Sequence, residues 1–194
     1  EDIAIVRGYL RETFTLDLTY FDNSRWNDTN MVRSLIAAEE WLMKRSCIIS
    51  YSDIVYSSDA VTRLINADGD IVISYDPNWE KLWKMRFNNP LEDAETFKIN
   101  NKSNILEIGK KTKNIKNIQG QYMGLIKFEP QGWKIFKNCL KKNFNNNFKK
   151  LYLTDILQKL IDEKFLIKGI KFIGKWAEVD TNKDYRIMKK IFKK

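Results

Sequence analysis

The segment Cys47-Ile48-Ile49-Ser50-Tyr51-Ser52-Asp53-Ile54-Val55-Tyr56 decides the fold. Its short apolar run lies between two helix-like segments, which is typical of a buried strand in a parallel sheet. In open α/β sheets, ligands bind outside the carboxyl ends of the strands. Asp53 follows such an end, and we therefore predict that its carboxylate carries a metal ion.

Helix and strand patterns alternate on both sides of this segment. Apolar residues recur at helical spacing over 31–44 and 57–67, whereas 47–52 and 71–75 are apolar runs of strand length. This alternation predicts an α/β fold with a mostly parallel sheet flanked by helices. Further along, the patterns predict a hairpin over 95–108, a strand over 121–128, short strands over 170–173 and 177–179, and helices over 130–143, 155–165 and 183–192.

The composition limits the chemistry that the chain can perform. With 194 residues, of which 43% are hydrophobic, residues 1–194 are expected to form one well-buried domain. Histidine is absent, which excludes Ser-His-Asp and Cys-His catalysis and most zinc chemistry. Chemistry must therefore use carboxylates, Lys or Arg, and an oxygen-binding metal such as Mg²⁺. The net charge of +9 indicates an anionic partner.

We predict from the sequence that the protein is cytoplasmic. Cys47 and Cys139 have no metal-ligand spacing, and two such residues fit a reducing compartment. No apolar stretch is long enough to span a bilayer, so we expect no membrane partner.

Asp53 and Asp180 are the sharpest pair of candidate site residues. Each closes a short apolar strand and precedes a helix-start signal, so both carboxylates are predicted to meet above the sheet and hold one Mg²⁺. The alternative is that each is only a helix cap or a strand-end acid.

Two other features suggest binding. Residues 75–109 combine aromatic faces with carboxylates, which suits an ammonium group, although core packing is the usual role of Trp. The residues concerned are Asp76, Trp79, Trp83, Asp93, Glu95 and Glu107. The Lys-rich segments 110–116 and 137–150 are candidates for nucleic-acid contact. Because they lack a recognisable nucleic-acid motif, we interpret them as solvated faces.

Motifs spread over nearly the whole chain carry a family resemblance: residues 5–9, 26–35, 51–54, 86–95, 107–110, 120–124 and 176–181. Together they resemble the nucleotidyltransferases of the sugar-phosphate type. They are most similar to the small cytidylyltransferases that act on phosphocholine and 2-aminoethylphosphonate. The resemblance implies a Rossmann-like sheet of the nucleotide-diphospho-sugar transferase type and Mg²⁺-dependent transfer of CMP from CTP, with release of pyrophosphate.

The resemblance also implies roles for individual residues. Asp53 and Asp180 would hold the catalytic Mg²⁺, and Asn30 and Ser34 would recognise the pyrimidine. The acceptor would be a small zwitterionic phosphate or phosphonate. Residues 75–95 and Trp176 would line its pocket. Arg86 or a nearby Lys would bind its phosphate or phosphonate, and Trp83, Asp93 and Glu95 would face its ammonium group. A homodimer is left open.

The sequence departs from the family at its beginning. The family opens with a strand and a Gly-rich loop that cradles the triphosphate, and nothing similar precedes Ile3, so the first βα unit is expected to be absent. Either the sequence is an incomplete record of a normal enzyme, or the enzyme lacks the loop. In the second case we predict very weak CTP binding and no turnover.

Two other functions are kept as alternatives. The first is a sugar-1-phosphate nucleotidyltransferase that uses UTP or dTTP in the same fold. The second is a non-catalytic basic binding module.

Overall fold

The computed structural model describes residues 2–145 and 151–193. The end of the basic segment 137–150 therefore lies partly outside the described residues. The strands are β1 (Ala4–Arg7), β2 (Thr19–Asp22), β3 (Cys47–Ser50), β4 (Ile54–Tyr56), β5 (Ile71–Asp76), β6 (Glu95–Ile99), β7 (Ile105–Lys111), β8 (Gln121–Phe128), β9 (Lys168–Lys171) and β10 (Trp176–Glu178). The α-helices are α1 (Met31–Ala37), α2 (Glu39–Leu42), α3 (Asp59–Ile65), α4 (Trp79–Arg86), α5 (Pro130–Phe144), α6 (Leu153–Asp162) and α7 (Asn182–Phe192).

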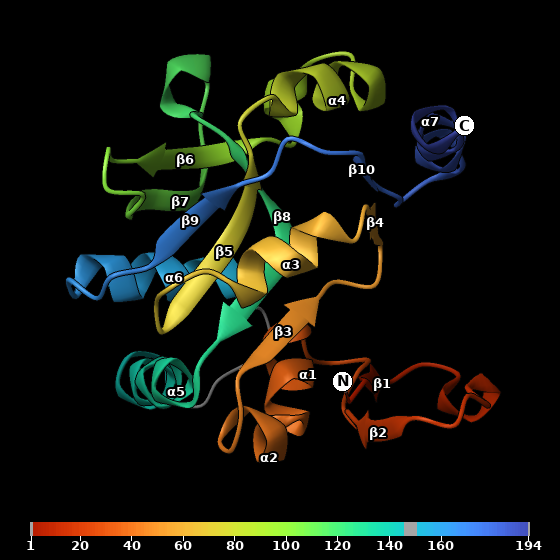
Figure 1. Cartoon of the computed structure of the whole chain (residues 1–194), viewed down its shortest axis with the longest axis vertical. Coiled ribbons are helices and arrows are strands. Elements are labelled where there is room, and N and C mark those ends of the chain that lie inside the picture. Colours follow the sequence, from red (N-terminus) through yellow and green to blue (C-terminus); the bar gives the residue numbers. More distant parts are fainter. Residues whose placement is uncertain (1, 146–150, 194) are drawn as a thin grey trace.

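The central sheet has the strand order β3-β8-β5-β9 (Figure 1). β8 runs antiparallel to both β3 and β5, and β5 runs parallel to β9. Three of the four strands therefore point the same way, which confirms the predicted α/β fold with a mixed, mostly parallel sheet.

The predicted position of the strand that begins at Cys47 is wrong in detail. β3 is an edge strand of the sheet, is only half-buried, and pairs antiparallel with β8. A short apolar run fits an edge strand as well as a central one, because such a run does not identify its neighbours. β3 also ends at Ser50, so Asp53 lies in the turn before the separate strand β4.

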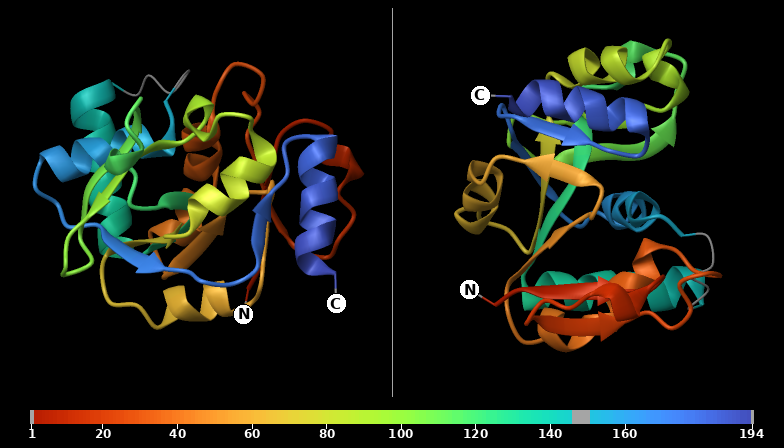
Figure 2. Two further views of the ribbon diagram at one scale, coloured as in Figure 1. Left: turned by 90° about the horizontal axis from the view of Figure 1, so that it is seen from above. Right: turned by 90° about the vertical axis from the view of Figure 1, so that its right-hand side faces the viewer.

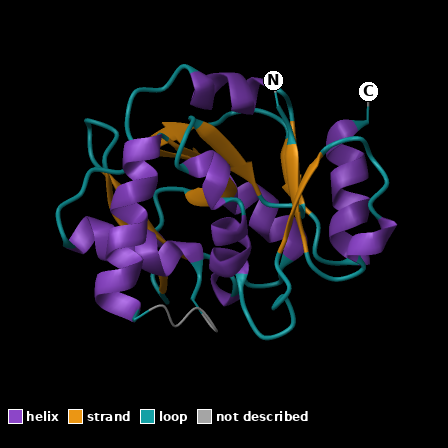
Figure 3. Ribbon diagram, turned by 90° about the horizontal axis from the view of Figure 1, so that it is seen from below, coloured by secondary structure: helices purple, strands orange, loops and turns teal. Residues whose placement is uncertain are grey.

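Both faces of the central sheet are buried, as a sheet flanked by helices requires. Ile71 and Ile73 of β5 share one core cluster with residues of α5 and α6, whereas Val72 faces a second cluster that includes α3 and α4. This alternation follows from the two-residue period of a strand. Figure 3 shows helices on both sides of the strands.

The ends of the helices follow from local sequence. Asn30 accepts a hydrogen bond from the Met31 amide at the start of α1, and Thr181 and Asp184 form a reciprocal capping box at the start of α7. The single helix predicted over 31–44 is instead two short helices, because Ala38 has a ψ of 15° and interrupts the α-helical path. None of the described helices is long and apolar enough to cross a bilayer.

Three two-stranded pairs surround the central sheet. β1 pairs parallel with β2, and β6 pairs with β7 as the predicted antiparallel hairpin. β4 pairs antiparallel with β10, and α7 packs against β10 (Figure 2). This β4–β10 pair carries the candidate site.

Candidate active site

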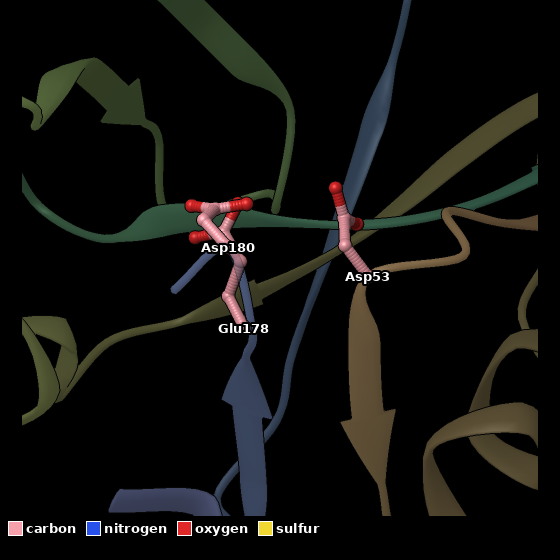
Figure 4. A group of neighbouring side chains, drawn as sticks. All are labelled: Asp53, Glu178 and Asp180. Carbon is pink, nitrogen blue, oxygen red and sulfur yellow. The ribbon is translucent and has the colours of Figure 1, made fainter. Parts of the chain in front are cut away.

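The antiparallel pairing of β4 with β10 brings Asp53 and Asp180 together. Glu178 at the end of β10 lies opposite Ile54 at the start of β4, and the Val179 amide donates to the Asp53 carbonyl at 2.8 Å. Asp53, which directly precedes β4, and Asp180, two residues after β10, thus lie at one end of the pair (Figure 4). The two aspartates were predicted to meet at the carboxyl ends of parallel strands, whereas the register of an antiparallel pair is what places them.

A third carboxylate, that of Glu178, lies with them and was not predicted from the sequence. Asp53, Glu178 and Asp180 each offer one oxygen, and these oxygens lie within 4.8 Å of one another. Glu178 and Asp180 are two residues apart, a spacing that places side chains on the same side of an extended chain. That spacing was the signal by which Glu178 was detectable.

Burial makes this cluster electrostatically costly. Asp53 Oδ1 is buried without a hydrogen-bond partner, and burial, with a contribution from the nearby Asp180, raises the pKa of Asp53. Burial also raises the pKa of Glu178 to about 7, although the Arg86 guanidinium opposes this shift. Carboxylates that share a site in this way favour a bound cation.

The residues present fit a divalent metal ion. Carboxylate oxygens are the ligands that Mg²⁺ prefers, and Mg²⁺ is usually bound through one or two of them together with substrate phosphates. The unpartnered Asp53 Oδ1 is an acceptor for which the described residues supply no donor. The geometry is therefore that of a candidate magnesium site.

Arg86 has a different environment from the predicted one. Its side chain is only 2% exposed, and its guanidinium bonds to Glu178, to Asp180 Oδ2 at 2.6 Å and to Asp184 Oδ1 at 3.1 Å. Each of its three nitrogens already donates to a carboxylate. The structure therefore does not support binding of an acceptor phosphate by this guanidinium.

The two tryptophans predicted at the acceptor pocket are core residues. Trp83 and Trp176 are 3% and 5% exposed, and their ring centroids lie 6.0 Å apart. Their indole N–H groups donate to Asp93 Oδ2 at 2.9 Å and to Asp76 Oδ2 at 2.8 Å. The core alternative that was left open for Trp therefore describes both residues in this structure.

The two predicted acceptor acids lie at the start of β6. Asp93 accepts the Trp83 indole N–H, and the pKa of Glu95 is raised, mainly by burial. Gln121 accepts from the Glu95 amide at 3.3 Å and donates to its carbonyl at 2.7 Å, which fixes the backbone there.

Asn30 and Ser34 lie on the first turn of α1. The Asn30 side chain accepts from the Met31 amide at 2.9 Å, and Ser34 Oγ accepts from Asn23 Nδ2 at 3.1 Å. Asn23 is 4% exposed and also donates to Thr29. It was not predicted from the sequence, and its polar contacts order the chain before α1.

Comparison with known proteins identifies the family. No family model matches the chain. A CTP:phosphoglutamine cytidylyltransferase from Campylobacter jejuni subsp. jejuni is 38% identical over 203 residues, which cover 96% of this chain and 80% of that protein.

Solved structures share the fold. A CTP:phosphocholine cytidylyltransferase from Streptococcus pneumoniae matches with a TM-score of 0.70 and 19% identity, over 99% of this chain and 78% of its own. An inositol-1-phosphate CTP transferase from T. maritima matches with a TM-score of 0.67 and 20% identity, over 89% of this chain and 66% of its own. Because this chain shares their fold and is 38% identical to the Campylobacter protein, it belongs to the cytidylyltransferases, the nucleotidyltransferases that use CTP.

Proposed function

We propose that the protein transfers CMP from CTP to a small amino- or choline-bearing phosphate or phosphonate in a Mg²⁺-dependent reaction. The observation that carries this proposal is the convergence of Asp53, Glu178 and Asp180 within 4.8 Å. The net charge of +9 supports it, because both substrates are anionic.

The reaction needs positioning more than covalent chemistry. An oxygen of the acceptor phosphate attacks the α-phosphorus of CTP, the bond to the β-phosphate oxygen breaks, and pyrophosphate leaves with that oxygen. A divalent ion held at this site would supply charge neutralisation for the phosphates. Asp53, Glu178 and Asp180 supply the oxygens that would hold the ion, and no side chain needs to form a covalent intermediate.

Other residues would bind the two substrates. We place the pyrimidine at Asn30 and Ser34, at the start of α1, and the ammonium group of the acceptor near Asp93 and Glu95. Trp83 would contribute indirectly, because its indole N–H donates to Asp93 and orients that carboxylate. The Campylobacter relative is named for phosphoglutamine, a phosphorylated amino acid, so that compound belongs among the acceptors to be tested.

A pyrophosphate-release assay on the complete natural protein tests this proposal. Four nucleoside triphosphates are combined with phosphocholine, 2-aminoethylphosphonate, phosphoglutamine and glucose 1-phosphate, with and without Mg²⁺. We expect turnover only with CTP and an amino- or choline-bearing acceptor, and a loss of at least 100-fold in Asp53→Asn and Asp180→Asn. Asp68→Asn, at an exposed position outside the cluster, is the matched control.

The same assay separates the alternatives. Best turnover with UTP or dTTP and the hexose phosphate would establish the sugar-1-phosphate reaction instead. Absence of turnover together with salt-sensitive binding to RNA, unchanged in Asp53→Asn, would favour the basic binding module.

A further inference from the structure

The Arg86 guanidinium binds two members of the carboxylate cluster, Glu178 and Asp180, through its terminal nitrogens. Its Nε is bound by Asp184, which lies outside the cluster. We propose that Arg86 is a positioning residue that builds the cation site, and that Asp184 sets its orientation. This inference rests on the proposed metal site, and goes beyond it by naming the residues that give the site its affinity.

The first step concerns which oxygen of each carboxylate the guanidinium binds. One terminal nitrogen donates to Glu178 Oε2, and the other donates to Asp180 Oδ2 at 2.6 Å. These bonds engage one oxygen of each carboxylate, so the second oxygen of each stays outside them. Arg presents its donors in a rigid planar fork, which fixes the spacing of two acceptors in a way that Lys does not.

The second step is charge. Glu178, Asp180 and Asp184 bond to a single buried guanidinium, and Asp53 lies beside two of them, so carboxyl groups outnumber the cation by four to one. Arg86 offsets enough repulsion to keep Glu178 and Asp180 side by side, and the remaining negative charge favours a divalent ion. A partner behind the metal ligands, rather than a ligand itself, is the usual way in which a protein orients such a site.

The third step is what holds Arg86. Its Nε donates to Asp184 Oδ1 at 3.1 Å, while Asp184 Oδ2 accepts from the Thr181 amide at 3.0 Å and from the Thr181 hydroxyl at 2.7 Å. Asp184 is 4% exposed. The guanidinium is therefore fixed to the first turn of α7, the helix that begins two residues after Asp180.

Metal binding in three variants tests the inference. Arg86→Lys keeps the charge but removes the fork, and Asp184→Asn weakens the anchor of Arg86 without changing any of the three proposed metal ligands. Asp155→Asn is the matched control, because it makes the same change at the capping box of another helix, α6, and Asp155 does not bond to Arg86. Folding is checked by circular dichroism, and the dissociation constant of Mn²⁺ is measured by electron paramagnetic resonance, with Mg²⁺ as competitor.

We expect the dissociation constant of Mn²⁺ to rise about 10- to 100-fold in Arg86→Lys and Asp184→Asn. Asp155→Asn is expected to keep the metal affinity within about twofold of wild type, whatever it does to the melting temperature. Wild-type affinity in a folded Asp184→Asn protein would overturn the inference, as would an equal loss in Asp155→Asn. No Mn²⁺ binding by the wild type would instead refute the proposed function, and this inference with it.

Discussion

Replacing Asp53 by Asn is expected to stabilise the metal-free protein. Asp53 Oδ1 is buried without a donor, and the pKa of the carboxyl is raised, first because it is desolvated and also because Asp180 is near. Asn has the same shape, carries no charge, and can donate to the neighbouring carboxylates. The substitution therefore removes repulsion that only a bound cation would otherwise offset.

The distances set the magnitude. Two unit charges 4.8 Å apart repel by roughly 3 kcal/mol at an effective dielectric constant of about 20. Asp180 is half exposed, and Arg86 neutralises part of the cluster, so the full value does not apply. We expect a net gain of about 1–2 kcal/mol, and hence a rise in melting temperature of roughly 2–8 °C for a chain of this size.

Thermal unfolding at pH 8 measures this effect, first with a chelator and then with 10 mM MgCl₂ (a concentration about tenfold above a millimolar Kd). Asp53→Asn should melt above the wild type with the chelator, whereas Mg²⁺ should raise the melting temperature of the wild type alone. If the variant melts below the wild type in chelator, the reasoning that repulsion dominates this cluster is refuted. An equal Mg²⁺ response in both proteins would show that Asp53 does not bind the ion.

Two further predictions concern Glu178 and Gly132. Burial raises the pKa of Glu178 to about 7 in the folded protein, above its ordinary value of 4.5, so in chelator the free energy of unfolding should fall by up to roughly 3 kcal/mol as the pH rises between these values. Denaturant titrations of wild type and Glu178→Gln over this pH range check this, and an equal pH dependence of the unfolding free energy in both proteins would contradict it. Gly132→Ala would place a Cβ 2.0 Å from the Asp70 carbonyl oxygen and should cost about 1–3 kcal/mol in thermal unfolding, whereas the exposed Lys134→Ala on the same helix should be nearly neutral.

Most elements of the fold were predictable because their signals are local. The amphipathic pattern of α6 and the apolar run of β5 identify these elements without knowledge of any neighbour. The position of β3 was not predictable in the same way, since its antiparallel partner β8 begins more than seventy residues later. Strand order is a property of the whole chain, and a short apolar run carries no information on it.

The two aspartates were found because strand ends concentrate functional carboxylates. The structure brings their side chains together for a different physical reason. It is the register of β4 against β10, in which the Val179 amide donates to the Asp53 carbonyl. Glu178 was missed because a glutamate inside a short strand reads as a solvent-facing residue. It is instead three-quarters buried on its side chain, with Arg86 as its partner.

Arg86 shows where reasoning from residue type fails. An arginine close to an expected phosphate site is naturally assigned to the phosphate, because both fit the same fork geometry. Arg86 and Glu178 are ninety-two positions apart, so no spacing rule reveals that each guanidinium nitrogen already donates to a carboxylate. β4 and β10 have only three residues each, which is too short for a stable pair on its own. The ion pairs from α4 to β10 and α7 therefore stabilise the same ribbon that presents the carboxylates, and the cation site and its local fold depend on the same contacts.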